Sequence, residues 1–282
     1  MTIPKRVLTF FSLLFWVLPV FAQPSRIGGA DTLIYLGQRF VERYQMKRPE
    51  LHFRVFGKEQ SAAMADNLDI LQIEGSAPAG NRLKFPIAVQ SVVLYVNKSN
   101  HIKELSVAQV RAIFLGRITN WKDLGGPDRT IALYAGESTT GTLPFFEDTV
   151  LHGEEPYPFE GKSNTHALLE VIASNPAAIG YGTVDSNPGV RAIAIKAGLT
   201  SGAVEPTIQN IRSQQYPITR HIYWAINPNA SRAVKDLCAW VLASDGQIVA
   251  EAAGFEPLLP EERNAGLFRL GLKEPGQVSA SR

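Results

Sequence analysis

Residues 106–148 constrain the fold more than any other stretch of the chain. Ser106 and Gln109 have the spacing of a capping box, which predicts a helix start. Apolar residues at helical spacing follow, and Gly116 is typical of a helix end because glycine takes the left-handed conformation without strain. A short buried strand is then expected over 130–134. A helix followed by a strand that feeds a second helix is typical of an α/β fold.

A loop rich in hydroxyl groups follows this strand. It reads Glu137-Ser138-Thr139-Thr140-Gly141-Thr142 and leads into an apolar helix. A strand, a Ser/Thr/Gly loop and a helix start place hydroxyls and unpaired backbone N–H groups around one point, which favours anions. Such a loop more often serves as a simple helix N-cap, so this motif alone leaves both interpretations open.

Strand and helix patterns alternate in the first third of the chain. A loop over 28–32 precedes a predicted helix over 33–44, and alternating apolar residues predict a strand over 51–55. A second loop, over 57–61, leads into another helix, and a strand is expected over 68–73. Both loops again place hydroxyl groups at helix starts, as in a sheet with ligand-binding loops at one edge.

Two long apolar runs suggest a chain that crosses between two lobes. Residues 85–97 are too many for one ordinary strand, so we expect this run to cross from a first lobe to a second. Residues 221–227 would cross back. The second lobe would include a helix capped at Ser163 or Asn164 and strands over 179–183 and 190–195.

Four motifs in a fixed order support a family resemblance. They are AIFLGRITNWKDLGGPD (112–128) with the following STTGT loop, PAAIGY (176–181), YPITR (216–220), and SDGQ (244–247) ahead of GFEPL (254–258). The ordered set, spanning about residues 30–259, resembles the phosphate-binding substrate proteins of ABC transporters, the PstS-like family.

This resemblance implies an α/β, two-lobed, periplasmic-binding-protein-like fold with two crossing hinge strands and a central ligand cleft. The implied division is a signal peptide, two lobes of which the first is discontinuous, and a flexible tail: 1–22, then 23–93 plus 222–270, then 94–221, then 271–282. Closure of the lobes over a ligand excludes water, a known route for periplasmic binding proteins.

The resemblance also implies which residues bind the oxyanion. They come from the three hydroxyl-rich loops and the end of one strand: Thr32, Leu33 through its backbone N–H, Ser61, Glu74, Thr140, Gly141 and Thr142. A carboxylate at Glu74 would accept a hydrogen bond from a protonated oxygen and reject a fully ionised anion such as sulfate. The alternative is that Glu74 is a solvated loop residue beside Gly75.

The chain departs from the family pattern in its charged ligands. Gly136 stands where the family has an arginine, and a guanidinium fork is the best single phosphate ligand. Lys58, Arg82 and Lys162 are alternative sources of positive charge, although each is typical of a solvated surface residue. The ligand is therefore expected to be inorganic phosphate or a related oxyanion.

The N-terminus predicts export. Lys5 and Arg6 precede an apolar run that ends at Ala22, as in a secretory signal peptide cleaved after that residue. Without Lys5 and Arg6 the formal charge falls from +2 to 0, which gives no reason to expect nucleic acid as a partner. Cys238 is the only cysteine and lies among apolar residues, so we expect a buried, inert thiol. We expect a periplasmic monomer without a cofactor or metal, and an ABC transporter permease as its partner.

Three classes of function compete. The first is a solute-binding protein for phosphate or a similar oxyanion. The second is a PstS-like scaffold with a degraded pocket that acts as a sensing or protein-interaction module. The third is a hydrolase using Ser138 or Thr140, but no G-x-S-x-G motif or Cys/His metal spacing is present. The first class is the prediction, and the chain is not expected to be an enzyme.

Overall fold

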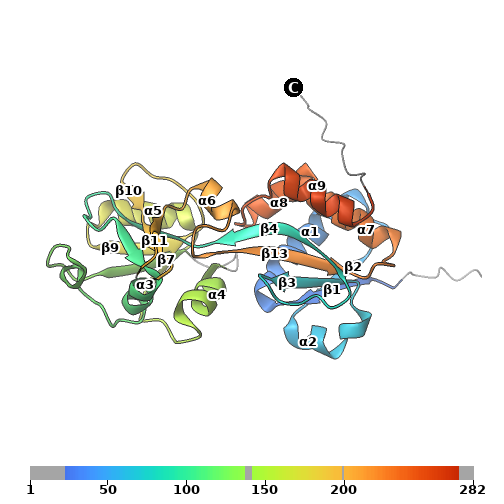
Figure 1. The fold of residues 1–282 in the computed structure, drawn as a ribbon, viewed down its shortest axis with the longest axis horizontal. Coiled ribbons are helices and arrows are strands. Elements are labelled where there is room, and N and C mark those ends of the chain that lie inside the picture. Colours follow the sequence, from blue (N-terminus) through green and yellow to red (C-terminus); the bar gives the residue numbers. More distant parts are fainter. Residues whose placement is uncertain (1–22, 137–141, 199, 273–282) are drawn as a thin grey trace, which may run out of the picture.

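The protein forms two lobes that lie side by side and are joined by long strands (Figure 1). The computed structural model describes residues 23–136, 142–198 and 200–272 of the 282-residue chain. The predicted signal peptide and most of the predicted tail lie outside these residues. No helix in the described ranges combines the length and the apolar character that a membrane crossing needs.

Lobe 1 is built on a sheet with the strand order β2-β1-β3-β13-β4. Strand β1 is parallel to β2 and β3, whereas β13 is antiparallel to β3 and β4. The strands are β1 (Ser25–Gly29), β2 (Phe53–Phe56), β3 (Ile70–Glu74), β4 (Leu83–Ser91) and β13 (Thr219–Ile226). The helical elements are η1 (Asp31–Leu33), α1 (Ile34–Lys47), α2 (Lys58–Ala63), η2 (Ala65–Asn67), α7 (Arg232–Leu242), α8 (Ser244–Ala252) and α9 (Pro260–Arg269).

Lobe 2 contains a mixed sheet with the order β10-β5-β9-β7-β8 and a smaller sheet with the order β12-β11-β6. The strands of the larger sheet are β5 (Val93–Asn97), β7 (Ala132–Gly136), β8 (Glu160–Lys162), β9 (Ala178–Gly182) and β10 (Val190–Ala192). Those of the smaller sheet are β6 (Glu104–Ser106), β11 (Ala194–Lys196) and β12 (Ala203–Val204). The helical elements are α3 (Val107–Phe114), η3 (Trp121–Leu124), α4 (Thr142–Phe146), the π-helical segment Glu147–Leu151, α5 (Thr165–Ser174) and α6 (Ile208–Arg212).

The chain crosses between the lobes at the positions where the long apolar runs predicted a crossing. The first run divides into β4, in the lobe 1 sheet, and β5, in the lobe 2 sheet. Val92 separates them, and its N–H donates to the Ile218 carbonyl at 3.0 Å, so the outgoing and returning segments are hydrogen-bonded at the crossing. The return strand β13 begins at Thr219, two residues before the predicted run.

Local sequence signals in lobe 2 are confirmed. Ser106 and Gln109 form both hydrogen bonds of the capping box at the start of α3. The helix ends at Phe114, and Gly116 has a φ of +68°, as its glycine predicted. The expected strand over 130–134 is present but lies two residues further along, as β7.

Two predictions about strands are wrong. Residues 28–32 were expected to be a loop, but Gly28 and Gly29 belong to β1, a strand flanked on both sides by β2 and β3. Glycine is used here for close packing: a Cβ at Gly28 would lie 2.2 Å from Oγ of Ser61. The run over 190–195 is two strands, β10 and β11, because they pair with different partners in different sheets.

A buried amide fastens α8 to the rest of lobe 1. The Gln247 side chain donates to the carbonyls of Ile87 at 3.0 Å and Val241 at 2.8 Å, and it accepts from the Leu258 N–H at 2.7 Å. These bonds connect β4, the end of α7 and the segment before α9. This network explains why a polar residue is buried at the centre of the SDGQ motif.

Replacing Gln247 with leucine is expected to lower the stability by about 2–4 kcal/mol, because three buried backbone groups lose their partner. At this chain length the loss corresponds to a fall of roughly 5–15 °C in the unfolding midpoint. Thermal unfolding followed by circular dichroism measures it. Gln209→Leu, at an exposed position of α6, is the matched control. A Gln247→Leu midpoint within about 2 °C of the wild-type value would contradict the prediction.

Candidate functional site

Lobe 1 contributes a polar cluster at the edge of the sheet where β1 and β3 end. Thr32 lies in η1, just after β1, and Glu74 is the last residue of β3. Because β1 and β3 are parallel neighbours, their carboxyl ends meet at one edge. The Thr32 hydroxyl donates a hydrogen bond to Oε1 of Glu74. The side chain of Glu74 is 22% exposed, so it is not a freely solvated loop residue.

Two further predicted ligands lie at the same edge with their polar groups engaged inside lobe 1. Ser61, in α2, is buried, and its Oγ accepts from the Gly29 N–H at 2.9 Å. The Leu33 N–H donates to the Ala30 carbonyl at 3.0 Å and closes the turn of η1. An anion bound here therefore has to share or replace hydrogen bonds that already exist.

Arg220 is the residue of this cluster that sequence reasoning missed. Its side chain is 12% exposed, and Nη2 donates to Oε1 of Glu74 at 2.7 Å. Nε donates to Oε1 of Gln90 at 3.0 Å, and Gln90 is its register partner on β4. A signal was available, since Arg220 ends the YPITR motif directly before the apolar return strand. The motif indicates the family but does not by itself indicate a ligand-binding role for Arg220.

The same guanidinium reaches lobe 2. Its central carbon lies 4.1 Å from the ring centroid of Phe145, in α4, and Nη1 lies 3.8 Å from Oδ2 of Asp148. Burial lowers the pKa of Arg220, whereas Glu74 and Asp148 raise it. The group remains a cation because arginine is not deprotonated in proteins. A charged side chain thus stands between the two lobes.

The lobe 2 half of the predicted site is represented by Thr142. It is the first residue of α4 and is buried, and it lies three residues before Phe145 on the same helix. Helix α4 therefore connects the predicted hydroxyl ligand to the surface on which Arg220 rests. Thr140 and Gly141 lie outside the described residues.

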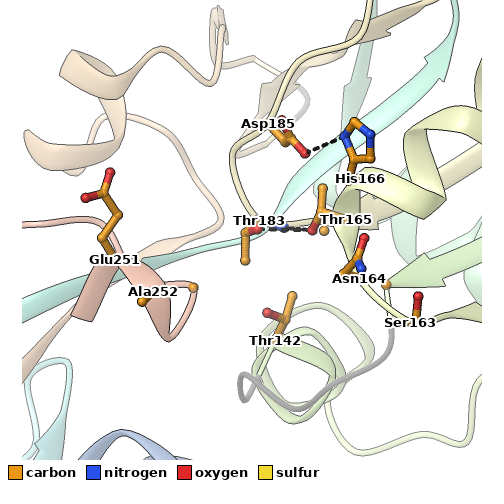
Figure 2. A pocket seen from close by; sticks show the side chains of 12 residues that line it. Thr142, Ser163, Asn164, Thr165, His166, Thr183, Asp185, Glu251 and Ala252 are labelled. Carbon is orange, nitrogen blue, oxygen red and sulfur yellow. Dashed lines mark hydrogen bonds and ion pairs between the residues drawn. The ribbon is translucent and has the colours of Figure 1, made fainter. Parts of the chain in front are cut away.

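A polar cavity of about 280 Å³ opens beside Thr142. The ends of β7 and β9 and the start of α5 line it from lobe 2, and α8 lines it from lobe 1 (Figure 2). The Thr165 and Thr183 hydroxyls face each other at 3.0 Å in its wall, and Glu251 lies across from them. Gly136 is also part of the wall, and a Cβ there would meet no atom closer than 3.7 Å.

The three cations considered from sequence have other environments. Arg82 donates to the carbonyls of Leu68 at 2.8 Å and Ala65 at 3.2 Å. Lys162 forms an ion pair with Glu160 at the edge strand β8. Lys58 and Arg82 both line a separate cavity of lobe 1 that is bounded by residues of β3 and α2. Of these three cations and Arg220, only Arg220 forms a side-chain contact with a predicted ligand residue of the described ranges, Glu74.

In the described part of the chain, the side chains considered for catalysis are not arranged as an active site. Ser138 and Thr140 lie outside the described residues. His166 is 69% exposed, with carboxylate oxygens of Glu170 and Asp185 at 3.7 and 3.8 Å, so it is not held in one orientation by a short hydrogen bond. Cys238 is fully buried, as expected, and burial raises the pKa of its thiol, which disfavours the reactive thiolate.

Comparison with known sequences identifies similar proteins. The family model described as a PBP superfamily domain matches residues 60–245. Phosphate-binding protein PstS of Staphylococcus aureus is 30% identical over 182 residues, a match that spans 61% of this chain but only 55% of that relative. Phosphate-binding protein PstS of Bacillus subtilis is 28% identical over 233 residues, covering 78% of this chain and 76% of the relative.

Solved structures share the fold. A possible phosphate-binding protein from Planctomyces limnophilus superposes with a TM-score of 0.76 at 19% identity, covering 88% of this chain and 97% of that one. An ABC-type phosphate transport receptor from Vibrio cholerae gives a TM-score of 0.65 at 21% identity, covering 84% and 100%. The α/β architecture with two lobes is therefore that of a known group of binding proteins.

Proposed function

The chain belongs to the PBP superfamily, and from that premise we propose that it captures phosphate or a similar oxyanion in the cleft between its lobes. The observation that carries this proposal is the cluster of Thr32, Glu74 and Arg220, which touches Phe145 of lobe 2. Hydroxyl, carboxylate and guanidinium groups meet there where the connecting strands run between the lobes. The guanidinium can donate charge-assisted hydrogen bonds to an oxyanion, the hydroxyl can donate a further one, and the carboxylate can accept from a protonated oxygen of the ligand.

The proposed ligand set includes residues of both lobes. Thr32, Leu33, Ser61 and Glu74 would act from lobe 1, and Thr142 from lobe 2, with Thr140 and Gly141 as predicted members outside the described residues. In this proposal the lobes are formed by about 23–93 plus 222–270 and by 94–221. These bounds fall inside the connecting segments, because β13 already joins the lobe 1 sheet at Thr219 and β5 joins the lobe 2 sheet at Val93. Closure about β4 and β13 brings the two halves of the site together and excludes water, which strengthens each charge-assisted bond.

Glu74 would set the protonation state of the ligand. A carboxylate accepts hydrogen bonds and donates none, so it favours an anion that still carries a proton. Phosphate near neutral pH carries one, whereas sulfate is fully ionised. The contact between Glu74 and Arg220 offers such a ligand an acceptor and a donor side by side.

The proposal extends to the setting in which the protein acts. The relatives from S. aureus and B. subtilis are named phosphate-binding proteins, and the V. cholerae structure is named an ABC-type phosphate transport receptor. We therefore infer export by a signal peptide over 1–22, a periplasmic location, and delivery of the ligand by a monomer to an ABC transporter permease. No catalytic step is part of this function.

Inorganic phosphate is expected to raise the unfolding midpoint of the mature protein, Gln23 onward. At about 100 times the dissociation constant, a ligand adds roughly 2.7 kcal/mol, or about 5–10 °C for a chain of this size. Thermal unfolding should be recorded with phosphate, arsenate, molybdate, sulfate and chloride at equal ionic strength. Sulfate and chloride are the matched controls. A response to molybdate and not to phosphate would keep the class and change the substrate.

One observation favours a second candidate, a sensing or protein-interaction module on the same scaffold. The Leu33 N–H and the Thr32 hydroxyl donate to partners within lobe 1, and the Ser61 hydroxyl donates to the Phe56 carbonyl at 3.4 Å. If the donors of a pocket already have partners, they gain little from a ligand, and the pocket can lose its binding function. The same experiment separates the candidates, because this module would show no midpoint shift with any of the anions.

A further inference from the structure

We propose that Arg220 is the cationic ligand of the bound oxyanion, and that it is supplied by the return strand β13 rather than by a loop of either lobe. The inference rests on the proposed function and adds to it a residue that the predicted ligand set does not contain. It assigns the main positive charge of the site to one side chain.

Within the described part of the chain, the hydrogen bonds of the guanidinium leave donors for a ligand. Nε is bound to Gln90 and Nη2 to Glu74, which uses two of the five N–H groups that arginine carries. Oδ2 of Asp148 lies 3.8 Å from Nη1, which is too long for a hydrogen bond. The bonds to Gln90 and Glu74 hold the fork in place, while Nη1 faces Asp148 in the π-helical segment of lobe 2.

The Arg220 charge is largely removed from water, so an anionic partner would stabilise it. The side chain is 12% exposed, and one flat face lies against the Phe145 ring. A buried cation needs paired charges and hydrogen bonds on its remaining donors to offset the lost hydration. Glu74 supplies a hydrogen-bonded partner, whereas Asp148 is 74% exposed and forms an ion pair at 3.8 Å without a hydrogen bond. An oxyanion at the Nη1 edge would complete the set.

The position of Arg220 on β13 suits a binding protein whose two lobes close over the ligand. Arg220 and Gln90 are register partners on β13 and β4, the strands at the connection between the lobes. A residue at this pivot moves little when one lobe rotates against the other. The guanidinium can therefore hold an anion that arrives in the open cleft and keep its contact as lobe 2 closes.

Calorimetric titration with inorganic phosphate tests the assignment on four variants of the mature chain. Arg220→Gln is expected to weaken binding by about 10- to 100-fold, the effect of losing a charge-assisted hydrogen bond. Arg220→Lys keeps the charge without the fork and should fall between Arg220→Gln and the wild type. Because Arg220→Gln leaves the half-buried Glu74 without its cation, the pair Glu74→Gln and Glu74→Gln/Arg220→Gln repeats the comparison with no carboxylate left behind. The double variant should again bind about 10- to 100-fold more weakly than Glu74→Gln alone.

Arg191→Gln is the control for losing a partly buried arginine. Arg191 lies in β10 of lobe 2 and is not part of the cluster of Thr32, Glu74 and Arg220. It donates to the carbonyls of Asn100 and Ile102, both at 2.7 Å. It should lower the unfolding midpoint and leave phosphate affinity unchanged. If Arg220 only braces the lobes, Arg220→Gln will lower the midpoint while affinity stays within twofold, which overturns the assignment alone. A wild-type protein that binds no phosphate overturns both this assignment and phosphate as the ligand in the proposed function.

Discussion

Phe146→Ala is expected to lower the stability of the protein by about 3–5 kcal/mol, the range for removing a buried aromatic ring. Phe146 is fully buried, and its ring stacks on Tyr181 with centroids 3.9 Å apart and planes 14° apart. It also meets the edge of Phe114 at 5.0 Å. These contacts pack α4 against β9 and α3, so the ring helps to fix the helix that carries Thr142.

The same substitution should weaken oxyanion binding by about tenfold, because one charge-assisted hydrogen bond of roughly 1.5 kcal/mol would lose its fixed position. Urea unfolding gives the change in stability, and phosphate titration at 15 °C gives the affinity while the variant is still folded. Phe268→Ala is the matched control, since Phe268 in α9 is 50% exposed. A loss below about 1 kcal/mol for Phe146→Ala would mean that α4 does not depend on this cluster.

Signals that act within a few residues could be predicted from the sequence. The capping box of Ser106 and Gln109 needs only two side chains and the adjacent backbone, and both of its bonds are present. Strand β1 was missed for the opposite reason. Its glycine pair resembles a loop in isolation, and only the close approach of Ser61 from α2 explains why glycine occupies a strand. Helix α9 was missed although Pro260 at its start is a recognisable signal.

The candidate site divides in the same way. The family resemblance pointed to Thr32 and Glu74, and the structure places them in direct contact. The YPITR motif marks Arg220 but not its contact with Glu74, because the two residues lie 146 positions apart and meet only through the pairing of β3 with β13. The loss of an arginine at Gly136 therefore suggested a weaker site than the folded chain presents. A contact made only by tertiary structure leaves no pattern in either local stretch of sequence.

Glu74→Gln is expected to have the largest effect on selectivity. The wild-type carboxylate accepts from the Thr32 hydroxyl and from Arg220 and would repel any anion without a proton. Glutamine keeps the size of the side chain, removes the negative charge and adds N–H donors. Sulfate affinity should therefore rise at least about tenfold relative to the wild type, a change of roughly 1.4 kcal/mol. Phosphate should lose its advantage over sulfate.

The stability of this variant should depend on anions more strongly than that of the wild type. Without a ligand, Arg220 loses its bonded carboxylate, which costs about 2–4 kcal/mol after allowance for partial exposure of the pair. A bound anion restores a negative partner to the guanidinium, so sulfate or phosphate should recover most of the lost midpoint. Thermal unfolding with and without each anion measures both effects, and Glu59→Gln, on the exposed side of α2, is the control. If Glu74→Gln unfolds at the wild-type temperature and still excludes sulfate, Glu74 neither balances the Arg220 charge nor selects the protonated ligand.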